Sequence, residues 1–263
     1  MPASSSSPPL AEGFRDFTAV VTGAGSGMGR ATAIAAARRG LRVAVLDRNL
    51  ETAQDTAAAI TQAGGKARAY KVDVSKSKEV DKAFVRIAKD LGPVGYLANI
   101  AGTDGRAPLE KLTDADWLNM FAVAVNGCFF CCRAALPGMM ERGFGSIVNM
   151  SSLHAQRGQA EMAHYAAGKG AIIGLTKSLA REKGALGIRV NAVAPGPIDT
   201  PLWRKGRAGA SLKRDIVERV KVIPLGRLGN AEEIAEAFIY LLSDHASYIT
   251  GHVLTADGGE IMS

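Results

Sequence analysis

The amino-acid sequence predicts an α/β fold, a parallel sheet with helices on both faces. Short apolar segments alternate along the chain with longer helical stretches, a pattern typical of parallel sheets. A glycine-rich turn follows the first apolar segment and opens a helix, as it does in doubly wound sheets. The chain has 263 residues, 47% of them hydrophobic, which is enough for a full core in a single domain.

The segments expected to form strands are short and bounded by turn residues. They cover residues 17–22, 42–47, 67–72, 94–99, 144–150, 187–193 and 252–256. Ligands of such sheets bind at the carboxyl ends of the strands. The residues at or just beyond those ends include Thr22, Asp47, Asp73, Asn99, Ser152 and Pro195. This arrangement predicts a ligand site along that edge of the sheet.

The first turn, TGAGSGMG at residues 22–29, lies between a strand-like run and the helical stretch 30–39. Glycines permit a tight turn and a close approach of backbone to a pyrophosphate, while the helix N-terminus offers N–H groups to phosphate. A plain tight turn is the alternative. The next predicted strand ends in Asp47, 24 residues after Gly23, near the expected position of a ribose-binding carboxylate. The sequence therefore favours a dinucleotide site over a plain turn.

Asp47 also bears on the choice of dinucleotide. A carboxylate accepts hydrogen bonds from the ribose hydroxyls of NAD and repels the 2′-phosphate of NADP. The glycine turn contains no basic side chain that would offset this repulsion, although the neighbouring Arg48 leaves NADP open. We therefore expect NAD.

Tyr165 and Lys169 stand four residues apart in a segment, 160–175, that reads as a helix, and Ser152 lies thirteen residues upstream of the tyrosine. Residues at i and i+4 share a helix face. A cation beside a phenol lowers its pKa, so Tyr165 becomes a candidate proton donor and acceptor. A chance pair on an exposed helix is the alternative interpretation.

Taken together, these motifs resemble the short-chain dehydrogenase/reductase family from about Phe17 to Gly259. The family's glycine loop matches residues 22–29, its adenine-contacting acid matches Asp73, and its N-N-A-G element is similar to residues 99–102. The matches to the family's catalytic tetrad are Asn126, Ser152, Tyr165 and Lys169. The resemblance implies one Rossmann-fold domain over residues 14–263, with seven strands and a substrate-loop insertion at about 201–222.

By this resemblance, hydride passes between a nicotinamide and an alcohol or carbonyl carbon, with Tyr165 as the acid/base. Ser152 would hold the substrate oxygen, and Asn126 would hold a water that relays protons past Lys169. The resemblance implies cofactor contacts at Gly23, Ser26, Gly27, Met28, Gly29, Asp47, Arg48, Asp73, Val74, Asn99, Ala101, Gly102, Tyr165, Lys169, Pro195, Gly196, Ile198 and Thr200.

Three functions are compatible with these residues. The first is an NAD-dependent oxidoreductase of a secondary alcohol or ketone. The second is a 3-oxoacyl-[acyl-carrier-protein] reductase. Such an enzyme would normally use NADPH, and Asp47 disfavours this interpretation. The third is a dinucleotide-sensing binding protein without turnover, which the complete set of four predicted catalytic residues disfavours.

Residues 1–13 form a tail rich in proline and serine that is expected to be flexible. It lacks the charged start and the apolar stretch of a signal peptide. No run of the sequence approaches the ~18 apolar residues of a membrane span. These observations predict a cytoplasmic protein without a membrane partner.

The three cysteines, Cys128, Cys131 and Cys132, crowd into one apolar segment. Because no second Cys/His pair accompanies them, we expect helix packing and no metal site. The apolar stretch 121–136 is compatible with the homotetramers and homodimers that the resemblance implies. His154 and His164 flank the predicted site, but the sequence alone assigns them no role.

The net charge of +7 is partly concentrated in residues 201–222, which contain seven basic and two acidic side chains. In a family of this kind the segment closes over substrate, so the small-molecule substrate could be anionic. A solvated helix face is the alternative. Nucleic-acid binding is not expected, because no basic and aromatic stripe accompanies the charge.

Overall fold

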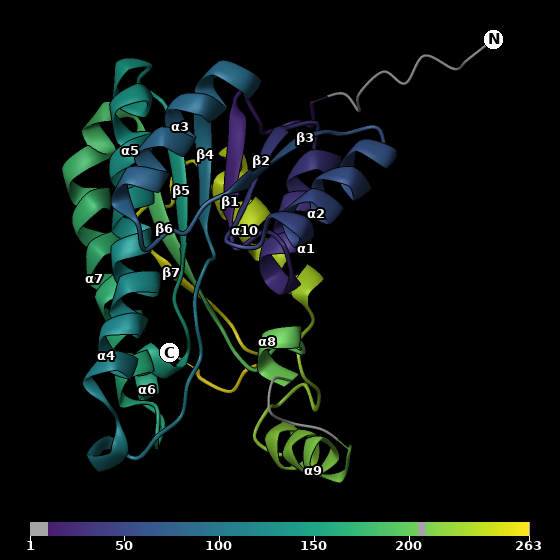
Figure 1. Ribbon diagram of the computed structural model, residues 1–263, viewed down its shortest axis with the longest axis vertical. Coiled ribbons are helices and arrows are strands. Elements are labelled where there is room, and N and C mark those ends of the chain that lie inside the picture. Colours follow the sequence, from purple (N-terminus) through teal and green to yellow (C-terminus); the bar gives the residue numbers. More distant parts are fainter. Residues whose placement is uncertain (1–9, 205–208, 263) are drawn as a thin grey trace.

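The computed structural model describes residues 10–204 and 209–262 and contains a seven-stranded sheet in which every strand pair is parallel (Figure 1). The strand order is β3-β2-β1-β4-β5-β6-β7, so the sheet is doubly wound from β1 and β4. Each predicted strand segment forms a strand, which confirms the predicted fold class. The strands are β1 (Thr18–Thr22), β2 (Arg42–Asp47), β3 (Lys66–Lys71), β4 (Val94–Asn99), β5 (Gly145–Met150), β6 (Ile188–Pro195) and β7 (Val253–Ala256).

Helices cover both faces of the sheet. One layer contains α1 (Gly27–Arg38), α2 (Leu50–Gln62) and α10 (Ala231–Leu242), and the other contains α3 (Ser77–Leu91), α5 (Gly127–Glu141) and α7 (Ala163–Lys183). Successive side chains of a strand point to opposite faces. In β1, Ala19 and Val21 therefore join the first core while Val20 joins the second.

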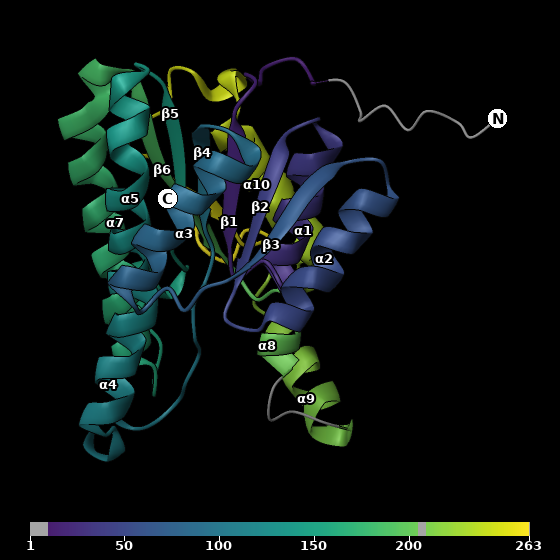
Figure 2. The ribbon, with the colours of Figure 1, turned by 45° about the horizontal axis from the view of Figure 1, so that its top comes forward.

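Short elements gather beyond the carboxyl ends of the strands. In Figures 1 and 2, α4 (Asp114–Met120) extends there on one side, and α8 (Pro201–Arg204) and α9 (Gly209–Val220) extend on the other. The π-helical turn η2 (Phe121–Asn126) joins α4 to α5, and α6 (His154–Arg157) follows β5. The remaining short turns are η1 (Leu109–Lys111), η3 (Gly184–Leu186) and η4 (Asp244–Ala246). Residues 205–208 of the predicted substrate loop lie outside the described residues.

The end of the predicted flexible tail is docked on the domain. The Ala11 N–H donates to the Arg39 carbonyl at 2.9 Å, and the Gly13 carbonyl accepts from the Asp244 N–H at 2.8 Å. Backbone groups of residues 11 and 13, at the end of the predicted flexible tail, therefore pair with the fold. Residues 1–9 lie outside the description.

A continuous helix from Asp114 to Glu141 is long and apolar enough to cross a membrane by length and composition alone, contrary to the expectation from the sequence. Such a helix is weak evidence for a membrane span, since a core helix passes the same test. Here the face that carries Cys131, Cys132 and Met139 is buried against the sheet, which accounts for much of the apolar composition.

Candidate active site

One large pocket opens at the carboxyl ends of the strands, where the sequence placed the ligand site. Its volume is about 770 Å³, within the ~300–1,000 Å³ typical of small-molecule sites. The predicted residues that line it are Gly23, Ser26, Gly27, Met28, Gly29, Asp47, Arg48, Asp73, Val74, Ala101, Gly102, Ser152, Tyr165, Lys169, Pro195, Gly196, Ile198 and Thr200. The tertiary structure thus brings together residues that follow six strands and two residues of helix α7.

The glycine turn has the geometry that a dinucleotide pyrophosphate needs. Gly23 has a φ of 64°, a conformation that favours glycine, and a Cβ at Gly29 would lie 2.0 Å from the Gly23 carbonyl oxygen. Ser26 makes no side-chain cap to α1, so the first N–H groups of that helix face the pocket without an internal acceptor. These residues fit a bound phosphate group.

The Asp47 carboxylate lies at the next strand end and lines the pocket. Its Oδ2 accepts a hydrogen bond from the Gly25 N–H at 2.9 Å, and its Oδ1 accepts from the Asn49 N–H at 3.0 Å. These bonds fix the orientation of the carboxylate relative to the glycine turn. A carboxylate oxygen has further acceptor capacity, so a ribose hydroxyl can still bind there.

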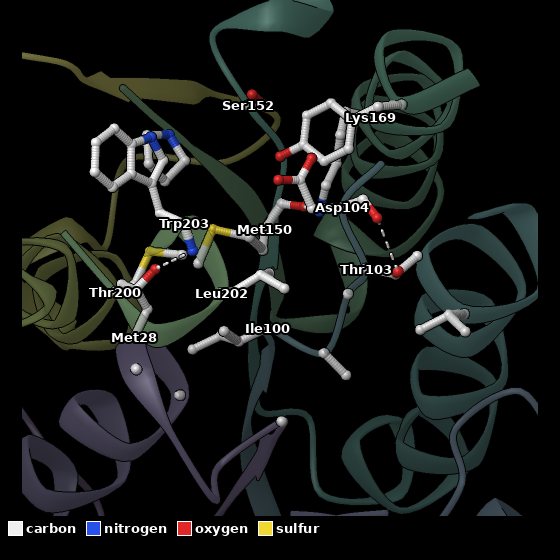
Figure 3. Close-up of a pocket in the computed structure, with 18 of the residues that line it drawn as sticks. Met28, Ile100, Thr103, Asp104, Met150, Ser152, Lys169, Thr200, Leu202 and Trp203 are labelled. Atoms are coloured by element: carbon white, nitrogen blue, oxygen red, sulfur yellow. Dashed lines mark hydrogen bonds between the residues drawn. The ribbon is translucent and has the colours of Figure 1, made fainter. Parts of the chain in front are cut away.

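Tyr165, Lys169 and Ser152 converge on one part of the pocket. The Lys169 Nζ lies 5.8 Å from the centre of the Tyr165 ring and donates to the Met150 carbonyl at 2.9 Å. Ser151 Oγ donates to the Lys169 carbonyl at 3.0 Å, which anchors α7 to the end of β5. Figure 3 shows Ser152 and Lys169 on the same side of the pocket as Met150.

Burial dominates the electrostatics of this group. It raises the pKa of the Tyr165 phenol to about 12, against the lowering effect of its hydrogen bond with Ser152. Burial also lowers the pKa of the Lys169 ammonium to about 8. The expected lowering of the Tyr165 pKa is therefore not found, because desolvation and the charge of Asp104 outweigh the hydrogen bond with Ser152. The Lys169 ammonium itself donates to the Met150 carbonyl.

The opposite side of the pocket is formed by the segment after β6. Ile198 and Thr200 are buried, and the Thr200 hydroxyl accepts a hydrogen bond from the Trp203 N–H at 3.2 Å. Figure 3 shows Thr200, Leu202 and Trp203 near Met28 of the glycine turn. This segment therefore covers the region between the glycine turn and the Tyr165 group.

Two predicted site residues do not line the pocket. Asn99 is buried beneath it, where its Nδ2 donates to the Asn149 Oδ1 at 2.9 Å and joins β4 to β5. Asn126 is exposed on the other face of its helix. The structure does not place Asn126 in the pocket, because the helix turns Val123, Ala124 and Gly127 inward and the asparagine lies outside that stripe.

Replacing Asn126 by alanine is accordingly expected to leave kcat and KM nearly unchanged. An exposed side chain outside the pocket contacts no reacting group, and surface substitutions of this kind usually change stability by less than ~0.5 kcal/mol. Steady-state kinetics of the Asn126→Ala variant would check this. A fall in kcat of about tenfold or more would restore the proton-relay role that the sequence suggested.

Several pocket residues had no individual prediction. Those with polar or large side chains include Asp104, Arg106, Asn119, His154, Met162, Trp203 and Arg219. Trp203 and Arg219 belong to the segment 201–222 that the sequence marked as a substrate loop. No sequence pattern predicts that Asn119 lines the pocket, because the position of this residue depends on where α4 packs.

Nearly the whole chain is similar to known dehydrogenases and reductases. Residues 23–260 match the family model described as Enoyl-(Acyl carrier protein) reductase. The 2-(S)-hydroxypropyl-CoM dehydrogenase 3 of Xanthobacter autotrophicus is 38% identical over 240 residues, which cover 91% of this chain and 94% of the relative. The 3-oxoacyl-[acyl-carrier-protein] reductase of Mus musculus is 39% identical over 244 residues, 93% of this chain and 98% of the relative.

The cis-4-hydroxycyclohexanecarboxylate dehydrogenase of Sinomonas cyclohexanicum is 40% identical over 252 residues, 95% of this chain and 98% of the relative. These relatives are named as dehydrogenases and reductases and span almost the whole chain. The pocket geometry and these matches lead to the same conclusion. The chain belongs to the short-chain dehydrogenase/reductase family and is an NAD(P)-dependent oxidoreductase that interconverts alcohols and ketones.

Proposed function

We propose that the protein is an NAD-dependent dehydrogenase or carbonyl reductase of a small secondary alcohol or ketone, with Tyr165 as its acid/base. The convergence of the Tyr165 phenol, the Ser152 hydroxyl and the Lys169 ammonium in the pocket of the glycine turn carries this proposal. The dinucleotide supplies or accepts the hydride when it is bound. The protein residues bind the substrate oxygen and manage its proton.

Ser152 and Tyr165 have different roles at the substrate oxygen. The Ser152 Oγ accepts from the His154 N–H at 3.2 Å, so the serine hydroxyl can donate its own proton toward the phenol or the substrate. A Tyr165 pKa of about 12 keeps the phenol protonated at neutral pH, which suits proton donation to a ketone. Lys169, protonated below about pH 8, favours the phenolate that proton donation leaves behind.

The preference for NAD rests on Asp47. Its carboxylate lines the pocket and is held by two backbone N–H groups, which suits hydrogen bonds from ribose hydroxyls and opposes a 2′-phosphate. Arg48 also lines the pocket and is exposed, so some NADP activity should remain.

The Asp47→Ser variant should lose much of its discrimination between the two dinucleotides. Hydrogen bonds to a charged acceptor are worth roughly 1.5–3 kcal/mol, so kcat/KM for NAD relative to NADP should fall by about tenfold to a hundredfold. Initial rates with each dinucleotide would measure the ratio, and Asp55→Ser on the neighbouring helix α2 is a matched control. An unchanged ratio would refute the ribose assignment.

Oxidation of NADH and of NADPH over a panel of small ketones, with and without an anionic group, would test the proposed activity itself. We expect turnover of at least one small ketone with NADH preferred. A strong NADPH preference together with turnover only of acyl-carrier thioesters would support the second candidate, a 3-oxoacyl-[acyl-carrier-protein] reductase, which the mouse relative's name suggests. NADH binding without any turnover would favour a dinucleotide-sensing protein.

We also propose that the protein acts in the cytoplasm as a homotetramer or homodimer. Cys128, Cys131 and Cys132 are buried free thiols, as expected in a reducing compartment. Trp117 and Phe129 are exposed on the long helix Asp114–Glu141, and burial of such aromatic side chains would stabilise a subunit contact. Light scattering on the purified protein would give the oligomeric state.

A further inference from the structure

A group of charged side chains lies at the end of the pocket that contains Tyr165 and His154. Arg219 of α9 and Arg106 of the loop after β4 both line the pocket. Of the other basic residues in the predicted substrate loop, Arg204 pairs with Asp199 and Lys221 pairs with Glu218. Arg219 is thus the basic residue of that loop's described part that reaches the pocket.

Arg219 shares a buried carboxylate with a second arginine. The Glu260 side chain is only 1% exposed, and its Oε1 lies 2.7 Å from the Arg157 Nη2 and 3.5 Å from the Arg219 Nη1. A buried carboxylate without charge partners is strongly unfavourable, so Glu260 depends on both guanidinium groups. One negative charge between two positive charges leaves a net positive charge beside the pocket.

Arg106 is presented to the pocket by a fixed loop. The N–H of the next residue, Ala107, donates to the Glu161 carbonyl at 2.9 Å. A Cβ at Gly105 would lie 2.9 Å from the His164 Nε2, so the loop packs directly on α7. The Arg106 side chain is exposed and forms no ion pair with the residues that the structure describes.

These arginines converge near the reacting phenol. The His154 and Tyr165 ring centres are 6.2 Å apart. Burial, together with the charges of Arg219, Arg157 and Arg106, lowers the pKa of His154 to about 4, so the imidazole is neutral at physiological pH. Asp104 lines the same region and is exposed, so it offsets only part of the positive charge.

We propose that the substrate carries a carboxylate group that Arg219 and Arg106 bind, and that Glu260 is a positioning residue that holds Arg219 in place. A guanidinium presents paired N–H donors that match a carboxylate. The substrate is then a hydroxy acid or keto acid whose oxygen reaches Tyr165 while its carboxylate reaches the arginines. This inference rests on the proposed alcohol–ketone activity.

Calorimetric titration of NAD-saturated protein tests the inference without turnover, because a ketone and oxidised dinucleotide form a dead-end complex. The probes are levulinate and acetoacetate, each compared with its methyl ester, which keeps the ketone and removes the charge. We expect each acid to bind about tenfold to a hundredfold more tightly than its ester. Arg219→Gln should remove most of that difference while leaving ester binding unchanged, and Arg106→Gln should reduce it.

Arg214→Gln is the matched control, since Arg214 is exposed on the same helix α9 and lies outside the pocket. The Arg214→Gln variant should still bind each acid more tightly than its methyl ester. Equal binding of acid and ester by the wild-type protein would overturn the inference. An equal loss in the Arg214→Gln and Arg219→Gln variants would also overturn it, because the effect would then be unspecific electrostatic attraction.

The Glu260→Gln variant distinguishes a positioning role of Glu260 from an effect of net charge alone. Removing a negative charge should strengthen binding of an anion if only net charge mattered. If Glu260 positions Arg219, levulinate should bind about tenfold more weakly while its methyl ester is unaffected. Tighter levulinate binding in this variant, with an unchanged melting temperature, would refute the positioning role. A failure of ketone turnover with intact acid preference would instead count against the proposed function alone.

Discussion

The Tyr165→Phe variant is expected to lose about 10³-fold in kcat while it binds NADH normally. The substitution removes a single oxygen atom, and general acid catalysis contributes ~10²–10⁴-fold to a rate. The ring remains and keeps its contact with His154, whose ring centre lies 6.2 Å away. The pocket should therefore retain its shape, and the loss should fall on the chemical step.

Steady-state kinetics of ketone reduction and fluorescence titration with NADH would measure the two effects separately. Tyr248→Phe is a suitable control, because the Tyr248 side chain is fully exposed and lies outside the pocket. Near-normal kcat in the Tyr165→Phe variant would mean that another group supplies the proton. A parallel loss of NADH binding would mean that the tyrosine mainly shapes the cofactor site.

The Lys169→Met variant is expected to be about 10²-fold less active and yet more stable at neutral pH. Burial lowers the Lys169 pKa from 10.5 to about 8, which corresponds to ~3 kcal/mol of unfavourable charge burial at pH 7. Methionine removes that cost and leaves the Met150 carbonyl without its donor, a loss of ~1 kcal/mol. The free energy of unfolding should rise by about 2 kcal/mol.

The pH dependence follows from the same shift. Between about pH 8 and 10.5 the folded chain has lost the Lys169 proton while the unfolded chain still holds it. The unfolded state binds more protons there, so the contribution of Lys169 to stability increases with pH. The stability advantage of Lys169→Met should therefore narrow from pH 8 toward 10.5.

Urea unfolding of both proteins across this pH range would measure the difference. Lys177→Met on the same helix is the control, because Lys177 is exposed and should show no such trend. A Lys169→Met protein that is less stable than wild type at pH 7 would show that the buried ammonium is a net stabilising group.

Local sequence was sufficient for most of the site. The glycine turn, Asp47 and the pair Tyr165 and Lys169 depend on short-range rules: strand ends, helix starts and the i, i+4 spacing. The parallel sheet then places these segments side by side, because all of its strands end at the same edge. These site residues can be predicted from sequence, since their positions at strand ends and on one helix face determine where their side chains point.

Asn126 marks the limit of that reasoning. Its distance along the chain from the other site residues is compatible with a role. The packing of η2 against α7 and of α5 against β4, however, turns Ala124 and Gly127 inward and leaves the asparagine exposed. The orientation of a residue on a helix depends on which face the rest of the fold covers. One position along the sequence changes that orientation by about 100°.

The amino-acid sequence by itself determined the fold class, the glycine turn and the pairing of Tyr165 with Lys169, because each follows from a pattern among residues close in sequence. Only the tertiary structure decided the pKa values of Tyr165 and Lys169 and the junction of Arg157, Glu260 and Arg219. Desolvation depends on everything that surrounds a group. Glu260 meets arginines from two distant helices only after the chain has folded.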